Sequence, residues 1–265
     1  MTAVAVPVVR PRQMVTPPIP LVRLTRVELR KMFDTRSGFW LMASLLITAL
    51  LATVGVILWA PDSELTYTTF VSAIRFPMAV ILPLIAILSV TSEWSQRSGL
   101  TTFTLVPHRS RVIGAKAISS VTVGVVATLL ALAIGALGNV AATAITGTTL
   151  VWDASLTDCL SVVLGSTLSL LTGFMLGVLI RATTGAIVAF FVYTFLIPTV
   201  FGLAAGQDWF RSLQPWVDVQ FAQAPLFNFA TPTGDQWTQI GFTGLIWLVL
   251  PLIVGLRFVV RSEVK

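Results

Sequence analysis

The chain has 265 residues, of which 55% are hydrophobic and only 11% are charged, and its formal net charge is +6. Soluble domains carry about 25% charged residues, so this composition excludes a single water-soluble core and indicates an integral membrane protein. The one cysteine excludes an intrachain disulfide, and the one histidine excludes a multi-histidine metal site. The basic residues lie between apolar segments rather than in one patch, a distribution that favours membrane topology over nucleic-acid binding.

The N-terminal part precedes the first long apolar run. Residues 1–20 contain five prolines and predict a disordered cytoplasmic arm. Residues 21–36 have apolar and basic sides that separate at the helical period, which predicts an amphipathic helix lying in the membrane interface. Thr25 and Glu28 match a capping box, so this helix starts at Leu21 or at Arg26. Its charged residues of interest are Arg23, Arg26, Glu28 and Arg30.

Six apolar segments follow that are long enough to cross a bilayer. The first has 21 residues, and a helix of that length measures about 31 Å, which matches a hydrocarbon core of about 30 Å. The predicted spans are 39–59, 77–91, 112–143, 159–180, 185–205 and 240–260. Residues 60–76 are predicted as an outer loop that can include a helical part, and an earlier start of the second span, with Arg75 snorkelling outward, is the alternative. Gly173 and Gly177 form a small-xxx-small pair that allows close helix packing. Residues 21–265 therefore make one all-α membrane domain.

A polar segment, residues 92–111, separates the second and third spans. Glu93 and Arg97 are four residues apart, in the order that favours a helix-surface pair. Pro107 ends that helix, because proline lacks an N–H group and disfavours a helical residue before it. We interpret the segment as a short amphipathic helix on the cytoplasmic face, held between two spans.

Residues 206–239, between the fifth and sixth spans, mix acidic residues with aromatic ones. This mixture is typical of short helices that lie at the outer interface or dip into it. The aromatic residues that we assign to an outer gate are Trp209, Trp216, Phe221 and Phe227.

The distribution of positive charge predicts the orientation. If both termini lie in the cytoplasm, 15 of the 17 Lys and Arg residues fall on the inner side, and only Arg75 and Arg211 fall outside. This asymmetry predicts six spans with both termini cytoplasmic.

The predicted spans lack the residues of several chemistries. None has a charged residue near its centre, which disfavours a proton- or ion-coupled transporter. The chain has no Gly-rich Lys-Ser/Thr phosphate loop, so it does not bind a nucleotide in that way. Ser166 after Gly165 could be read as the nucleophile of an intramembrane hydrolase, but the only histidine, His108, falls in the inner loop. We therefore assign no catalytic and no metal-ligating residue.

The whole arrangement resembles the type-2 ABC transporter permeases, and most closely the small bacterial exporter permeases that work with a separate ATPase subunit. The local likeness lies in an acid, a glycine with hydroxyl neighbours, a proline followed by arginine, and a lysine, in that order. These are Thr91-Ser92-Glu93, Ser98-Gly99-Leu100-Thr101-Thr102, Pro107-His108-Arg109-Ser110-Arg111 and Lys116.

This resemblance implies a homodimer of permeases in a bacterial cytoplasmic membrane, seated on two ATPase subunits. Residues 97–106 would form the coupling helix, residues 21–36 the connecting helix and residues 206–239 the extracellular gate. The coupling set is Glu93, Arg97, Ser98, Gly99, Thr101, Thr102, Phe103, Pro107, Arg109, Arg111 and Lys116.

The same resemblance implies that the partner ATPase binds ATP and Mg, and that this chain holds no cofactor and is not itself an enzyme. The cargo would be hydrophobic or amphipathic: drug-like, lipid-like or a peptide. The alternative function is a non-transporting assembly or scaffold subunit of a cell-envelope or cofactor-maturation complex. An intramembrane enzyme is the weakest reading, because paired catalytic groups are missing.

Overall fold

The computed structural model describes residues 19–95 and 109–261, and this part of the chain is almost entirely helical, without a strand. Six of its helical segments are long and apolar enough to cross a membrane. They are Arg36–Trp59, Tyr67–Ser92, Ser110–Thr146, Leu156–Ile180, Thr183–Ala204 and Gly234–Val259. The predicted class, an all-α multi-pass membrane protein, is therefore confirmed. The arm predicted over residues 1–20 falls almost wholly outside the described residues, as does the predicted coupling helix, residues 97–106.

The first half of the chain consists of long helices. These are α1 (Leu21–Asp34), α2 (Arg36–Trp59), α3 (Tyr67–Ser95), α5 (Arg109–Thr146) and α6 (Leu156–Ile180). The second half is built from shorter pieces. These are α7 (Thr183–Phe191), η2 (Val192–Leu196), α8 (Ile197–Ala204), α9 (Asp208–Val217), α10 (Val219–Gln223), η3 (Ala224–Phe227), α11 (Gly234–Gly244), η4 (Leu245–Val249) and α12 (Leu250–Arg261).

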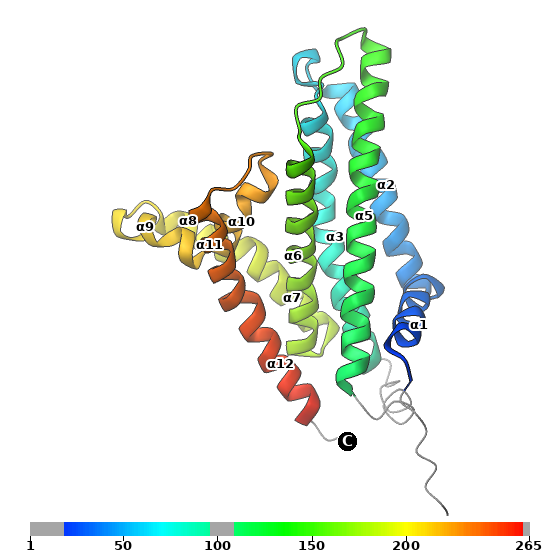
Figure 1. Cartoon of the computed structure of the whole chain (residues 1–265), viewed down its shortest axis with the longest axis vertical. Helices are drawn as coiled ribbons and strands as arrows, with labels where there is room; N and C mark the ends of the chain where they lie inside the picture. The colour runs from blue at the N-terminus through cyan, green and yellow to red at the C-terminus, as the bar shows by residue number, and fades with distance from the viewer. Residues whose placement is uncertain (1–18, 96–108, 262–265) are drawn as a thin grey trace, which may run out of the picture.

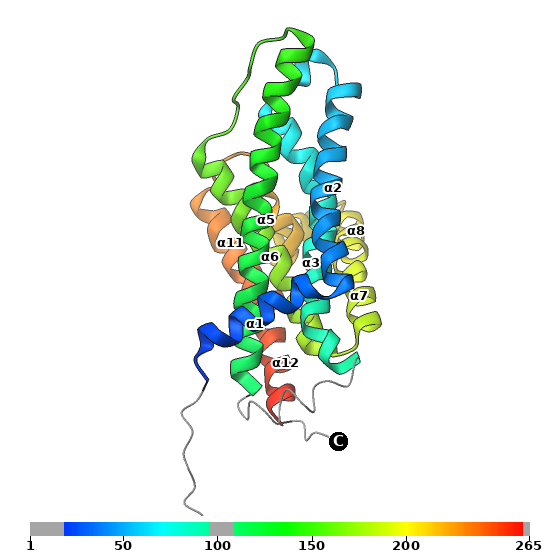
Figure 2. The same cartoon turned by 90° about the vertical axis from the view of Figure 1, so that its right-hand side faces the viewer.

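Helix α3 lies at the centre of the bundle and packs against α2, α5, α6 and α7, while α6 also packs against α12. Both views place α1, the lower ends of α3 and α5, and the end of α12 at one end of the bundle (Figures 1 and 2). The segment from α8 to α11 lies level with the middle of α5 rather than with its upper end (Figures 1 and 2). An even number of spans brings the two ends of the described chain to the same side.

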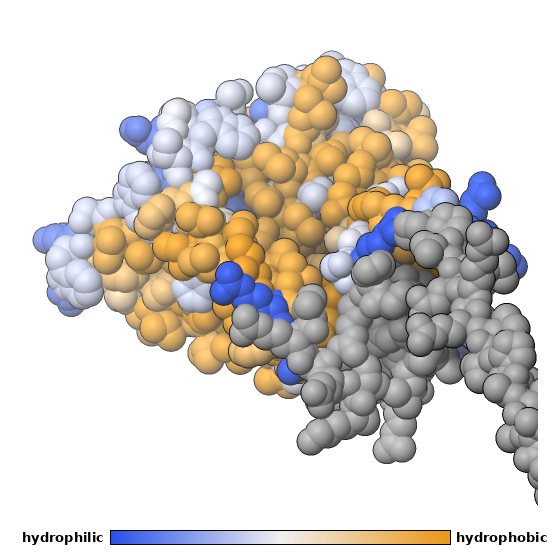
Figure 3. All heavy atoms as spheres, turned by 60° about the horizontal axis from the view of Figure 1, so that its bottom comes forward, coloured by the Kyte–Doolittle hydropathy of each residue, from blue (hydrophilic) through white to orange (hydrophobic). Residues whose placement is uncertain are grey.

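The outer surface of the spans is apolar. Large side chains such as Leu51, Leu58 and Leu137 are more than 60% exposed, and Figure 3 shows a broad apolar surface between two more hydrophilic regions. Helices suit such surroundings, because each one satisfies its backbone hydrogen bonds internally. These exposed apolar side chains are therefore better accommodated by lipid than by water.

Side chains mark where individual helices begin and turn. Thr35 separates α1 from α2, and its hydroxyl accepts a hydrogen bond from the Gly38 N–H at 3.2 Å. Ser155 and Asp158 form a capping box at the start of α6. Arg181, which the sequence places at an inner turn, has φ 58° and turns the chain directly from α6 into α7. Short connections of this kind keep consecutive spans side by side.

Each of the last two spans contains a π-helical segment directly before a proline. Segment η2 precedes Pro198 in the fifth span, and η4 precedes Pro251 in the sixth. Proline lacks the N–H group that would bond the carbonyl four residues earlier, and its ring crowds that carbonyl. The wider π turn absorbs the defect and allows the span to continue as a helix.

The centre of the bundle depends on close contact between α3 and α6. A Cβ atom added to Gly173 would lie 2.4 Å from the carbonyl oxygen of Pro83, and one added to Gly177 would lie 3.3 Å from that of Ile87. Both glycines of the small-xxx-small pair thus face α3, as close packing requires.

Two of the predicted spans begin too late. The second was predicted over 77–91, but α3 starts at Tyr67, so most of the predicted outer loop 60–76 is helical. The charge of Arg75 was taken as a boundary, whereas its side chain is partly buried inside the bundle. The sixth was predicted over 240–260, but its helix starts at Gly234, behind a capping box formed by Thr233 and Gln236.

The contact at Gly173 yields a test of the packing. Gly173→Ala is expected to lower the free energy of unfolding by about 1–3 kcal/mol, because the new methyl group meets backbone that cannot rotate away. Gly202→Ala is the matched control, since nothing lies within 4 Å of a Cβ atom there. Titration with dodecyl sulfate in mixed micelles measures the free energy of unfolding of both variants. Equal stability of the two variants would contradict the packing.

Candidate functional site

A buried ion pair joins α1 to α5 at the lower end of the bundle. Lys116 Nζ lies 2.7 Å from Glu28 Oε2, and the side chains are only 4% and 10% exposed. The same ammonium group donates a hydrogen bond to the Ser89 carbonyl oxygen of α3 at 2.9 Å. Lys31 Nζ lies 2.7 Å from the other carboxylate oxygen, Glu28 Oε1. We call Glu28, Lys31, Ser89 and Lys116 the basal clamp, because together they fasten α1 to both neighbouring spans.

A second contact holds the same helices together one turn away. Ser119 Oγ donates a hydrogen bond to the Thr25 carbonyl oxygen of α1 at 3.2 Å. Helix α1 begins at Leu21, so one of the two predicted starts is correct, and the Thr25 hydroxyl donates back to the Leu21 carbonyl oxygen instead of capping the helix. Two contacts, one turn apart, therefore bind α1 to α5.

The electrostatics of the basal clamp keep Glu28 ionised. Burial alone would raise its pKa, but the ammonium groups of Lys116 and Lys31 outweigh burial and hold the pKa below its ordinary value. A charge left without its partner in such a place destabilises the fold by about 3–5 kcal/mol. The pair therefore fixes one position of α1 rather than merely attaching it.

Three further members of the predicted coupling set fall in the described parts of α3 and α5. Glu93 falls in the last turn of α3 and Arg109 in the first turn of α5, while Arg111 is partly buried in α5. The remaining members lie outside the described residues: Arg97, Ser98, Gly99, Thr101, Thr102, Phe103 and Pro107. The clamp thus binds together the two helices from which residues 96–108 leave and to which they return.

The other members of the predicted connecting set face away from the bundle. Arg23, Arg26 and Arg30 are exposed, and Arg30 Nε lies 2.9 Å from Asp34 Oδ2 on the same helix. Of the four residues in the predicted connecting set, only Glu28 has a side chain that points into the bundle. The sequence assigned Glu28 and Lys116 to different helices, but nothing in it indicated that they pair across 88 residues.

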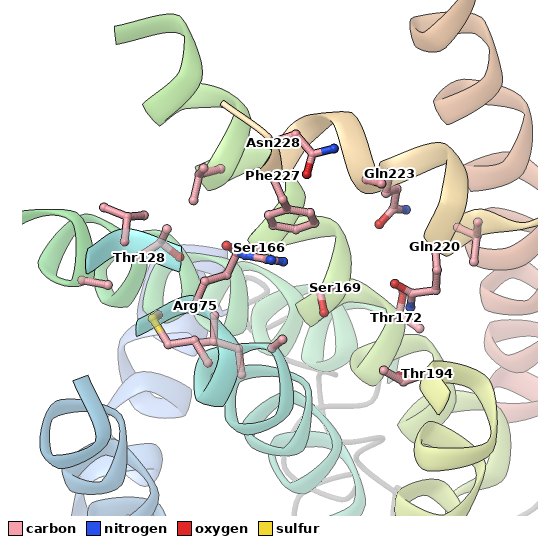
Figure 4. A pocket seen from close by; sticks show the side chains of 18 of the residues that line it. Arg75, Thr128, Ser166, Ser169, Thr172, Thr194, Gln220, Gln223, Phe227 and Asn228 are labelled. Atoms are coloured by element: carbon pink, nitrogen blue, oxygen red, sulfur yellow. The ribbon is translucent and has the colours of Figure 1, made fainter. Parts of the chain in front are cut away.

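A cavity of about 210 Å³ lies deeper in the bundle, and residues of α3, α5, α6, α7, η2, α10 and η3 line it with a mixture of apolar and polar side chains. Hydroxyl groups of α6 line one wall, with Ser166, Ser169 and Thr172, and amide side chains of the outer segment line another, with Gln220 and Gln223 (Figure 4). Most of these residues carry no charge, so the cavity offers hydrogen bonds to a polar group at membrane depth.

Arg75 of α3 points into this cavity beside Ser166 and beneath Phe227 (Figure 4). Its guanidinium carbon lies 4.6 Å from the centroid of the Phe227 ring, a cation–π contact. Gly165 makes room for that ring, because a Cβ atom there would lie 2.5 Å from Phe227 Cζ. The predicted start of the second span at Pro77, which left Arg75 outside that span, is therefore wrong.

A signal for this position was present in the sequence. Phe70, Ile74 and Met78 recur every four residues and continue as the buried face of α3. This four-residue spacing continues on both sides of Arg75, so it would have extended the predicted helix back toward its observed start.

The four residues of the predicted outer gate do not come together. Phe227 lines the cavity, whereas Trp209 is 69% exposed and packs against Phe210. Trp216 packs against Phe242, and Phe221 is 49% exposed. Only one member of the set therefore contributes to the interior site.

The interior serine does not have the surroundings of a nucleophile. Ser166 is 8% exposed and lies next to the Arg75 guanidinium, which cannot act as a base (Figure 4). His108, the one histidine, lies outside the described residues. Within residues 19–95 and 109–261, no three His, Cys, Asp or Glu side chains gather as metal ligands.

No family model matches this chain, and no curated protein matches it. The fold defines the class: a multi-pass α-helical membrane protein with six candidate spans.

A double-mutant cycle tests the basal clamp. Glu28→Gln and Lys116→Met are each expected to lower the free energy of unfolding by about 3 kcal/mol or more, because each removes one member of a buried ion pair. The double variant should lose less than the sum of the two. The exposed pair Arg30–Asp34 is the control: Arg30→Gln with Asp34→Asn should change stability by less than about 1 kcal/mol. Additive losses in the first cycle would contradict the pairing.

The lowered pKa of Glu28 predicts a pH dependence. A carboxylate whose pKa is lower in the folded protein stabilises the fold fully above its ordinary value, 4.5, and loses that contribution as the pH falls through the folded-state value. The stability difference between the native chain and Glu28→Gln should therefore stay constant near pH 7 and shrink below about pH 4.5. Thermal unfolding in detergent across this range measures it, and a difference that grew with acidity would have the wrong sign.

Proposed function

We propose that this chain is the membrane-spanning permease subunit of an ATP-driven exporter that moves a hydrophobic or amphipathic cargo across a bacterial cytoplasmic membrane. In this proposal two copies of the chain sit on two separate ATPase subunits, which bind ATP and Mg and carry out all the hydrolysis. The observation that carries the proposal is the basal clamp, which fastens the interfacial helix α1 to the two spans flanking residues 96–108.

The clamp supports this function because a coupling device must transmit movement without deforming. A push on residues 96–108 reaches α3 and α5 at their lower ends, where Lys116 already joins both helices to α1. Helix α3 then contacts α2, α5, α6 and α7 along the bundle. Movement of one rigid element therefore shifts several spans together.

The cavity beside Arg75 supports transport over the alternative, a non-transporting assembly subunit. A scaffold needs surfaces for its partners, whereas a cavity among the spans with hydroxyl and amide groups in its walls can receive the polar group of a cargo. Hydroxyl and amide groups at membrane depth are costly unless they are satisfied or serve a ligand.

Site-specific crosslinking tests the proposal. The chain has a single cysteine, so Cys159→Ser gives a background into which Phe103→Cys and Trp209→Cys are introduced separately. Each variant is expressed with the ATPase encoded beside it. We expect the cysteine at position 103 to crosslink to that ATPase and to react with an impermeant maleimide only after the membrane is opened. The cysteine at position 209 should react from outside and form no such crosslink.

Coupling itself is measured on the purified complex in lipid nanodiscs. Glu28→Gln should leave the ATPase bound while reducing cargo-stimulated ATP hydrolysis. The proposal fails if position 103 is labelled from the outside, or if no ATP-hydrolysing subunit crosslinks there.

A further inference from the structure

We propose that Arg75 forms an anion-binding site inside the membrane, and that this site takes the oxyanion head group, a carboxylate or a phosphate ester, of an amphiphile. The inference rests on the described side chains around Arg75 and not on the proposed export function. It therefore holds or fails whether or not an ATPase binds the chain.

The first step is the position of the charge. Arg75 lies eight residues inside α3, which corresponds to about 12 Å of helix from its start at Tyr67, and its side chain is partly buried among the spans. Arginine is among the residues that cost most to insert into a bilayer, and intramembrane charges are normally paired. A guanidinium retained at this depth therefore needs a counter-charge.

The second step is that the described chain supplies none. No hydrogen bond or ion pair among the described residues involves Arg75, and its Nε is buried without a partner. The residues that line the cavity include no Asp or Glu. Asp218, on the outer segment, already accepts hydrogen bonds from the Gln220 and Phe221 N–H groups and from Gln214 Nε2. Phe227 covers one face of the guanidinium but leaves its N–H groups directed into the cavity (Figure 4).

The third step is that the neutral groups around Arg75 suit an oxyanion. Ser166 and Ser169 offer hydroxyl donors, and Gln220, Gln223 and Asn228 offer amide donors (Figure 4). A guanidinium presents parallel N–H groups that match a carboxylate or phosphate, and such charge-assisted hydrogen bonds are the strong ones. A cationic ligand would instead meet Arg75 as a like charge.

The fourth step sets the kind of ligand. The cavity, about 210 Å³, is smaller than the roughly 300–1,000 Å³ of pockets that enclose a drug-sized molecule. It holds a head group and not a whole amphiphile. Met78, Leu82 and Leu132 form an apolar part of its wall, and the surrounding spans expose apolar surface to lipid. An acyl chain can therefore remain among the spans while its head group reaches Arg75.

Thermal unfolding of the purified full-length chain tests the site. The chain is placed in phosphatidylcholine nanodiscs, without an ATPase, and unfolding is followed by tryptophan fluorescence. The added probes are oleate, oleyl alcohol with the same chain but a neutral head, and inorganic phosphate. A second set of nanodiscs contains phosphatidylglycerol, which separates a membrane lipid from an added fatty acid as the source of the head group.

The variants are Arg75→Gln, Arg75→Lys and the control Arg211→Gln. Arg211 is the other arginine of the outer half, and it is exposed beside Asp208. We expect oleate or phosphatidylglycerol to raise the unfolding temperature of the native chain and of Arg211→Gln. In Arg75→Gln the apparent affinity for oleate or phosphatidylglycerol should fall at least about tenfold. The affinity of Arg75→Lys should lie between those of the native chain and Arg75→Gln, because lysine keeps the charge but loses the parallel donors.

A second readout separates ligand binding from a structural role. If Arg75 is held for a ligand, Arg75→Gln removes an unpaired charge, so the ligand-free variant should unfold at a higher temperature than the native chain. The proposal is overturned if ligand-free Arg75→Gln is less stable, or if it responds to oleate and phosphatidylglycerol as the native chain does. Equal stabilisation by inorganic phosphate alone would overturn the assignment to an amphiphile.

Discussion

The ion pair between Glu28 and Lys116 is the constraint on which the lower half of the molecule depends. Both groups are almost fully buried, and the ammonium group also bonds the Ser89 carbonyl oxygen, so α1, α3 and α5 meet at one point. Burying two charges costs desolvation energy that their attraction only partly offsets, so such pairs contribute little net stability. What the pair does provide is one favoured position of α1, because a shift of that helix separates two buried groups of opposite charge.

Helix α3 carries this constraint through the bundle. Its lower part holds Ser89 in the basal clamp, its upper part holds Arg75 in the cavity, and Pro83 between them lies against Gly173 of α6. The close contact at Gly173 leaves no space in which α3 could slide without moving α6 as well. Helix α3 therefore connects the two sites, with Pro77 and Pro83 between them, and coupling through it requires that the helix has two positions.

The spans were predictable because bilayer thickness and internal backbone bonding act on each segment separately. Arg75 was missed for a related reason: hydropathy treats any charge as a boundary, while the contacts that accommodate this one come from Phe227, 152 residues later in the chain. The pairing of Glu28 with Lys116 likewise spans 88 residues, and neither residue alone differs from an ordinary interfacial charge. Local periodicity predicts helices, but contacts between distant helices decide which charges are buried and with which partner.

Lys116 and Arg75 differ in the partners that the described chain supplies to them. Lys116 has a carboxylate within 2.7 Å, whereas Arg75 has an aromatic face and a cavity lined by neutral donors. Two acids of the connecting segments already have donors. Asp153 accepts hydrogen bonds from Thr68 at the start of α3, and Asp218 accepts them from two backbone N–H groups at the start of α10. Each of these carboxylates stabilises a helix N-terminus, where the backbone already supplies its donors. Asp153 and Asp218 thus bind groups at helix starts, and the residues that line the cavity supply no carboxylate to its guanidinium.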